Sequence, residues 1–121
     1  MTDALRVAIV DPLPEIHAAI ADLLCGVAGI RIVGHARSLR EYASSADEPA
    51  DVLVVDLRTC LGPERTVLDR LRAQHGFRVV VTTSDTEPHY GEAALRLQAD
   101  AWVPKARLAV DLVRTLRGLA V

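Results

Sequence analysis

The sequence predicts a single α/β domain over residues 1–121, built on a doubly wound sheet of five parallel strands in the flavodoxin-like order 2-1-3-4-5, with about five helices. Three observations lead to this fold class. The chain has 121 residues, which is the length of one domain with one core. Short runs of β-branched residues alternate with stretches of helical periodicity along the chain. Strand–helix–strand units at this spacing impose parallel pairing with right-handed crossovers.

Five short apolar runs are the predicted strands. Residues 52–55 and 79–81 are apolar throughout, which is typical of strands that helices cover on both faces. Pro104 lacks the amide donor that a sheet ladder needs, so we expect the fifth strand at an edge of the sheet. The predicted strands are residues 6–10, 30–35, 52–55, 78–82 and 101–103.

Helical periodicity fills the segments between these strands. The first helix is expected to reach Val27 and to contain Cys25, and Glu48-Pro49 is expected to close the second. Apolar stripes mark the first and last helices: Ile16, Ile20, Leu23, Leu24 and Val27 in one, and Leu108, Leu112, Leu116 and Leu119 in the other. The other helices are expected within residues 39–46, 64–74 and 88–98.

Composition argues against several classes of protein. The chain is 50% hydrophobic but only 3% aromatic, so its core is aliphatic, and a net charge of −2 without a basic run disfavours nucleic-acid binding by this chain itself. No apolar run approaches the roughly 18 residues of a membrane span, and no signal peptide is visible. Two cysteines fit reduced thiols in a cytoplasm better than a disulfide framework. The four histidines never fall at a metal-ligand spacing.

Polar side chains gather where the predicted strands end. In such sheets ligands bind outside the carboxyl ends of the strands. Asp11 ends the first strand, Asp56 the third and Thr83-Ser84 the fourth, while Lys105, the only lysine, follows the fifth. This set suits phosphoryl chemistry: a carboxylate nucleophile, a carboxylate for a hard cation, and a donor and a cation for the phosphoryl oxygens.

Each of these residues also has a purely structural interpretation. Asp11 could cap the first helix, with Pro12 or Pro14 in the first turn. The other structural interpretations are a turn residue for Asp56, a helix-entry residue for Thr83, a solvated surface lysine for Lys105 and core filling for Trp102.

Four segments, residues 7–14, 51–58, 79–84 and 90–105, resemble the receiver domain of bacterial two-component response regulators. The resemblance extends over essentially the whole chain and implies a CheY-like fold, and residues 93–105 look most like receivers that precede a LuxR-type helix-turn-helix domain. It implies a cytoplasmic signalling domain of a transcriptional regulator rather than an enzyme. Such a domain takes a phosphoryl group from a histidine kinase and reaches DNA only through an output domain, which lies outside this chain.

The resemblance assigns roles to the polar residues. Asp56 matches the phosphoacceptor, and Lys105 matches the lysine that pairs with the acceptor and then with the phosphoryl oxygens. Asp11 matches the first of two adjacent acids that, together with Asp56, hold Mg²⁺, and Arg58 matches the residue whose backbone carbonyl is a further ligand. Thr83 and Trp102 match the switch hydroxyl and the switch aromatic, whose ring swings inward when the hydroxyl turns toward the phosphoryl group.

The sequence departs from the family at Pro12, where the second acid should stand. Proline supplies no side-chain oxygen, and Glu15, a turn further on, is a doubtful substitute. We therefore expect Mg²⁺ to bind weakly or not at all, with a loss of roughly two orders of magnitude in affinity. Cys60 and Ala106 also stand where the family usually has other residues near the site. Nothing around Cys60 in the sequence suggests the lowered thiol pKa of a redox sensor.

Other classes fit less well. A phosphatase of the haloacid dehalogenase type needs an acid two residues after its nucleophile, and Arg58 stands there. A nucleotide- or flavin-binding module needs a glycine-rich first turn, which the stretch 11–14 lacks. Two interpretations stay open within the receiver class: a phosphorylated switch, and a phosphorylation-independent module for dimerisation or ligand sensing.

The last predicted helix is apolar on more than one side. Val110, Val113 and Ala120 lie off its main stripe, and such a helix is usually covered on more than one side. Receivers of the resembling group often self-associate through this helix, paired with the first helix or with the fourth and its neighbouring strand. We expect a symmetric homodimer through the last helix that forms without phosphate.

Overall fold

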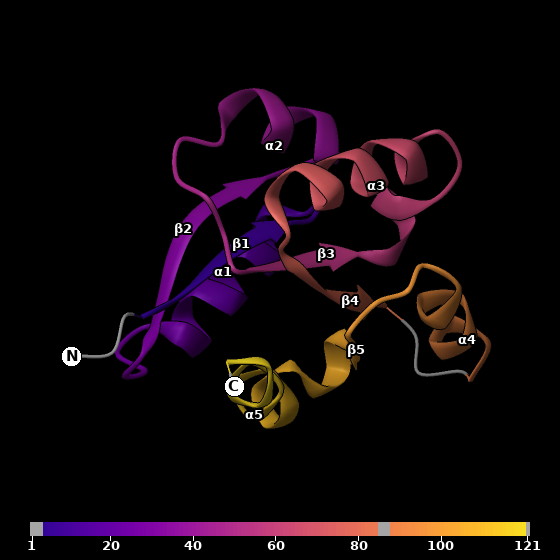
Figure 1. The fold of residues 1–121 in the computed structure, drawn as a ribbon. Helices are drawn as coiled ribbons and strands as arrows, with labels where there is room; N and C mark the ends of the chain where they lie inside the picture. The colour runs from indigo at the N-terminus through magenta and orange to yellow at the C-terminus, as the bar shows by residue number, and fades with distance from the viewer. Residues whose placement is uncertain (1–3, 85–87, 121) are drawn as a thin grey trace.

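A computed structural model describes residues 4–84 and 88–120 and shows the predicted alternation of strands and helices (Figure 1). The strands are β1 (Leu5–Val10), β2 (Ile30–Ala36), β3 (Val52–Asp56), β4 (Arg78–Thr83) and β5 (Ala101–Pro104). The helices are α1 (Pro14–Leu24), α2 (Leu39–Ser45), α3 (Glu64–His75), α4 (Pro88–Arg96) and α5 (Leu108–Leu119), with short 3-10 helices at Leu57–Cys60 and Lys105–Arg107.

All five strands pair in parallel in the order β2-β1-β3-β4-β5, so the predicted fold class and strand order are confirmed. The central strand β3 is bonded on both sides, and Val54 lies between Ile9 of β1 and Val80 of β4. Pro104 ends β5 at the edge of the sheet, where a missing amide donor breaks no ladder.

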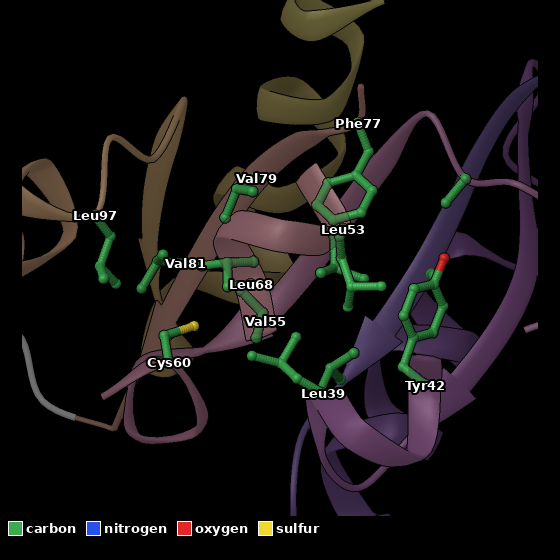
Figure 2. Packing of buried hydrophobic residues seen from close by; sticks show 14 of the residues in the cluster. Leu39, Tyr42, Leu53, Val55, Cys60, Leu68, Phe77, Val79, Val81 and Leu97 are labelled. Carbon is green, nitrogen blue, oxygen red and sulfur yellow. The ribbon is translucent and has the colours of Figure 1, made fainter. Parts of the chain in front are cut away.

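Helices cover both faces of the sheet (Figure 1), and alternating strand residues fill an apolar layer on each face. Leu53, Val55, Val79 and Val81 face α2, α3 and α4, and Figure 2 shows this layer. The opposite layer packs the sheet against α1 and α5 through Ile20, Leu24, Leu108, Leu112 and Leu116. Because β1, β3 and β4 are covered on both faces, their carboxyl ends are held rigidly beside one another.

The observed helix ends differ from the predicted ones. α1 ends at Leu24, because Gly26 adopts a left-handed φ of 76° just beyond it, so Cys25 is the helix C-cap and Val27 lies outside. α2 ends at Ser45, before Glu48-Pro49. α4 ends at Arg96, shortly before Gln98, which has a left-handed φ of 57°. Beyond the helix, the guanidinium of Arg72 donates to the carbonyls of Leu97 and Gln98.

Within residues 4–84 and 88–120, no helix is both long and apolar enough to cross a membrane. Both cysteines are free thiols, Cys25 exposed and Cys60 buried.

Candidate functional site

Three charged side chains from separate strand ends meet at the carboxyl edge of the sheet. Asp11 follows β1, Asp56 ends β3, and Lys105 follows β5. Lys105 Nζ lies 2.8 Å from Asp11 Oδ2 and 2.9 Å from Asp56 Oδ1. Asp11 and Asp56 are only 1% and 3% exposed, and 12% of the Lys105 side chain is exposed. The structure thus places one ammonium group between two buried carboxylates.

The surroundings favour the charged form of this lysine. Burial alone would lower the pKa of the Lys105 ammonium, but hydrogen bonding to Asp11 and then to Asp56 outweighs it, so the pKa lies above its ordinary value. Asp56 Oδ2 accepts from the backbone N–H of Arg58 at 3.1 Å, which fixes the second oxygen of that carboxylate.

The loop after β1 holds Asp11 in place. Its Oδ1 accepts from the backbone N–H of Leu13 at 2.8 Å, and its backbone carbonyl accepts from a ring nitrogen of His17 at 2.7 Å. Leu13 is the N-cap of α1 and Pro14 its first residue, so Asp11 does not cap the helix. No pattern in the sequence indicated a role for His17, because its contact depends on how α1 packs against the loop.

Thr83 lies at the end of β4 and is 2% exposed. It is hydrogen-bonded to Trp102, which the resemblance assigns as the switch aromatic. Trp102 Nε1–H donates to Thr83 Oγ1 at 2.9 Å. The indole ring lies against Gly91 of α4, where a Cβ atom would be only 2.6 Å from a ring carbon. Gly91 therefore makes room for the ring, and sequence reasoning missed it because only the packing of α4 reveals it.

A small pocket of about 100 Å³ opens beside Asp56. Arg58, which is exposed, lies at this pocket, and the complete lining is Asp56, Leu57, Arg58, Thr83, Ser84 and Tyr90. The hydroxyl-bearing residues and Arg58 could contact an anion attached to Asp56. Tyr90 was not among the predicted site residues.

Cys60 lies beneath the site, where its thiol is shielded from solvent. It is fully buried, and its thiol contacts the Asp56 carbonyl at 3.5 Å. Burial raises its pKa to about 12, with the charge of Asp56 acting in the same direction. A buried thiol with a raised pKa is a poor nucleophile, so we expect Cys60 to be unreactive in the folded domain.

The described residues include no cluster of three or more His, Cys, Asp or Glu side chains that could hold a metal ion. Asp11 and Asp56 are the carboxylates of the site, Pro12 adds no oxygen, and Glu15 is exposed on α1. Asp11 Oδ2 is buried, and the Lys105 ammonium 2.8 Å away is its charged partner.

Comparisons with known proteins bear on the fold and the family of the chain. No protein-family model matches the chain. The response regulator RamR of Streptomyces coelicolor is 33% identical over 88 residues, which covers 73% of this chain and 44% of RamR. The chain therefore spans less than half the length of this curated relative.

Solved structures show the same fold. The non-phosphorylated receiver domain of Escherichia coli RcsB matches with a TM-score of 0.79 at 23% identity, covering 98% of this chain and 94% of that one. A chain from the complex of the CheA3 P1 domain with CheY6 of R. sphaeroides matches with a TM-score of 0.85 at 21% identity, covering 98% of both chains.

The fold is of the CheY-like class, and the similarity to a response regulator makes the chain a signalling module rather than a classical enzyme. The chain belongs to the receiver domains of two-component response regulators and is related to the receivers of transcription regulators.

Proposed function

We propose that this chain is the regulatory receiver domain of a transcriptional regulator and that Asp56 is its phosphoacceptor. The observation that carries the proposal is the reach of Lys105 to both buried carboxylates. A lysine so placed can follow the negative charge from the free carboxylate to a phosphoryl group on Asp56. Residues 1–121 then act as one domain, and contact with DNA requires an output domain outside them.

The chemistry is a direct phosphoryl transfer. An Asp56 carboxylate oxygen attacks the phosphorus of a phosphohistidine, the O–P bond forms as the P–N bond breaks, and the imidazole leaves and takes up a proton. The pocket beside Asp56 leaves space for the phosphoryl group, and Lys105 with Thr83 supplies a cation and a donor for its oxygens. The partner in this proposal is a histidine kinase, by analogy with the CheA3–CheY6 complex.

The switch follows from the same contacts. The Thr83 hydroxyl accepts a hydrogen bond from Trp102. If Thr83 turns toward a phosphoryl group on Asp56, this bond must lengthen or break. Movement of the indole ring between α4 and β5 would then carry the signal to the surface.

Mg²⁺ binds this domain weakly in our proposal. Receivers hold the ion with two adjacent acids, the acceptor and a backbone carbonyl, and Arg58 would supply that carbonyl here. Pro12 removes one carboxylate oxygen and one negative charge, so the set of donors is incomplete for a cation that demands octahedral oxygen coordination. Asp11 and Asp56 are the side chains left for it.

The test is phosphorylation with an acyl-phosphate donor. Intact-protein mass spectrometry should find one added phosphoryl group on the wild type and none on Asp56→Asn. Asp47→Asn, which removes an exposed carboxylate, is the matched control. No phosphoryl adduct on the wild type, with or without Mg²⁺ and with a kinase phosphodonor as well, would overturn the assignment of Asp56.

A second candidate function is a phosphorylation-independent interaction module. Pro12 favours it, because a receiver with a weakened metal site cannot depend on phosphorylation for assembly. On α5, Val110 is 63% exposed, which leaves an apolar position for a partner. A domain that dimerises equally with and without phosphoryl donor has this second function.

A further inference from the structure

Two histidine rings meet between α1 and the edge strand β2, outside the acidic site. His17 is half-buried on α1, and His35 is exposed near the end of β2. Their ring centroids lie 5.3 Å apart at an interplanar angle of 54°. In the described part of the chain, His35 makes no hydrogen bond or ion pair. The two rings come from separate elements, so no spacing pattern in the sequence reveals the pair.

A β-bulge brings His35 to the face of the sheet that α1 covers. The pairing of β1 with β2 shifts its register along the strands, so that Ile9 pairs with His35. Val33 and Ala36 both pack in the layer on the opposite face, although strict alternation would put residues at this odd spacing on different faces. The irregularity re-aims the end of β2. His35 therefore shares the face of Ile9, which packs in the layer against α1.

His17 is held in the way that metal-binding histidines usually are. Its Nε2 atom lies 2.7 Å from the backbone carbonyl of Asp11, and because a carbonyl can only accept, Nε2 carries a proton and donates. In the neutral ring, Nδ1 then keeps a free lone pair. Histidines that bind metals almost always donate their other ring N–H to a carbonyl, a carboxylate or water, which fixes the ring and makes the ligating nitrogen more basic.

The separation of the two rings is the one that a tetrahedral metal ion requires. With a metal–nitrogen bond of about 2.1 Å, the ion lies about 3.2 Å from each ring centre, and at the tetrahedral angle the two centres are about 5.2 Å apart. Ligands at right angles, as in square-planar or octahedral sites, bring the centres to about 4.5 Å. The 5.3 Å between His17 and His35 agrees with the tetrahedral value. Imidazole and tetrahedral geometry together favour Zn²⁺, whereas Mg²⁺ prefers oxygen ligands.

We propose that His17 and His35 form a binding site for Zn²⁺, through Nδ1 of His17 and one ring nitrogen of His35. The described residues offer no cluster of three ligating side chains, so water completes the coordination and the affinity is lower than that of a structural site with four protein ligands. The ion ties α1 to the edge strand β2, and through His17 it acts on the Asp11 carbonyl in the loop after β1. The site needs no phosphoryl group on Asp56, so it is independent of the proposed function.

Titration with ZnCl₂ tests the site. Calorimetry on metal-free wild-type protein should show one equivalent of Zn²⁺ bound, with a dissociation constant of roughly micromolar order. His35→Gln removes one ligand and should weaken binding at least about tenfold. His75→Gln, which changes an exposed histidine at the end of α3, is the matched control and should bind as the wild type does. Asp56→Asn and Cys25→Ser should also bind normally, which excludes the acidic site and the exposed thiol as the binding groups. Equal Zn²⁺ affinity in His35→Gln and the wild type would overturn the proposal.

Histidine NMR locates the ion without any variant. The chain has four histidines, and on addition of ZnCl₂ the ring signals of His17 and His35 should shift together while those of His75 and His89 stay in place. Co²⁺ in the same site should give the strong visible absorption of a tetrahedral complex. A shift of only one of the two rings, or no shift up to about millimolar Zn²⁺, contradicts the two-histidine site. These measurements on the wild type decide the question even if His35→Gln fails to fold.

Discussion

Trp102 and Thr83 are joined by a hydrogen bond of 2.9 Å from the indole Nε1–H to the Oγ1 atom. The bond ties the edge strand β5 to the end of β4, next to the acidic site. The ring can reach Thr83 because it lies over Gly91, whose missing side chain leaves the space. Three residues from separate elements therefore define one position of the indole ring.

Gly91→Ala should displace the ring. The new Cβ would lie 2.6 Å from a ring carbon, which is closer than real contacts allow, so Trp102 must move and its bond to Thr83 must weaken. Because Trp102 is the only tryptophan, the variant should show a red-shifted emission and stronger acrylamide quenching. Gly118→Ala on α5, where a Cβ meets nothing within 4 Å, is the matched control and should instead gain about 0.5–1 kcal/mol of stability. Unchanged Trp102 emission in Gly91→Ala would contradict the packing of the indole ring against Gly91.

The architecture could be predicted from the sequence because it depends on local patterns. Runs such as 52–55 are apolar enough to identify strands buried on both faces, and the rules of parallel sheets then bring Asp11, Asp56 and Lys105 to one edge. The order of the strands and the edge position of β5 followed in the same way.

Contacts between distant side chains could not be predicted. The resemblance implied the contact of Lys105 with Asp56 but not its contact with Asp11. That contact, the bond of His17 to the Asp11 carbonyl and the place of Trp102 against Gly91 all depend on how helices and loops pack. The helix ends were missed for a different reason. Val27 continues the apolar stripe of α1 by spacing alone, but the left-handed turn at Gly26 ends the helix before it.

The ion pair between Arg6 and Asp51 should make stability depend on pH. The side chain of Arg6 donates to both Asp51 oxygens, and the Arg6 backbone N–H donates to Oδ2 at 2.8 Å. These bonds, the side-chain ones first, hold the pKa of Asp51 below its usual range. A lowered pKa in the folded state contributes stability above the unfolded pKa of about 3.9, and this stability is lost as the pH falls through the folded pKa.

Asp51→Asn should therefore cost about 1 kcal/mol near neutral pH, a modest value because both side chains are about one-third exposed. Urea unfolding of the wild type and the variant across a pH series measures the difference, which should shrink as the medium becomes acidic enough to protonate Asp51. Asp47→Asn, at an exposed carboxylate, controls for the general effect of charge. If the difference in unfolding free energy between the wild type and Asp51→Asn stays constant down to strongly acidic pH, the substitution disrupts packing instead.

The two thiols should differ sharply in reactivity. Cys25 is exposed at the end of α1, whereas Cys60 is buried with a pKa of about 12. A disulfide reagent at mildly alkaline pH should modify one thiol per native chain quickly, and the second only after unfolding in denaturant. Cys25→Ser should abolish the fast reaction. Fast modification of this variant in native buffer would restore a redox role for Cys60.

The outer face of α5 should mediate self-association. Leu108, Leu112 and Leu116 bury one side of this helix against the sheet, yet Val110 on another side is 63% exposed. Around it, Arg107 and Arg114 both bond Asp111, which offsets one of the two positive charges of this group. An apolar residue within such a face suits a symmetric contact between two copies of the chain.

The wild type should sediment as a dimer at tens of micromolar without any phosphoryl donor, through an interface on the order of 1,000 Å² or more in total. Val110→Lys should give a monomer, because the interface would bury an unpaired charge. Leu95→Lys changes the 73% exposed leucine of α4 and distinguishes the two possible pairings. If it leaves the dimer intact, α5 pairs with the side of α1; if it also yields a monomer, α4 and β5 take part. A wild type that is monomeric alone but dimeric after treatment with an acyl-phosphate donor would contradict phosphate-free assembly. It would favour the phosphorylated switch, because assembly would then follow phosphorylation of Asp56.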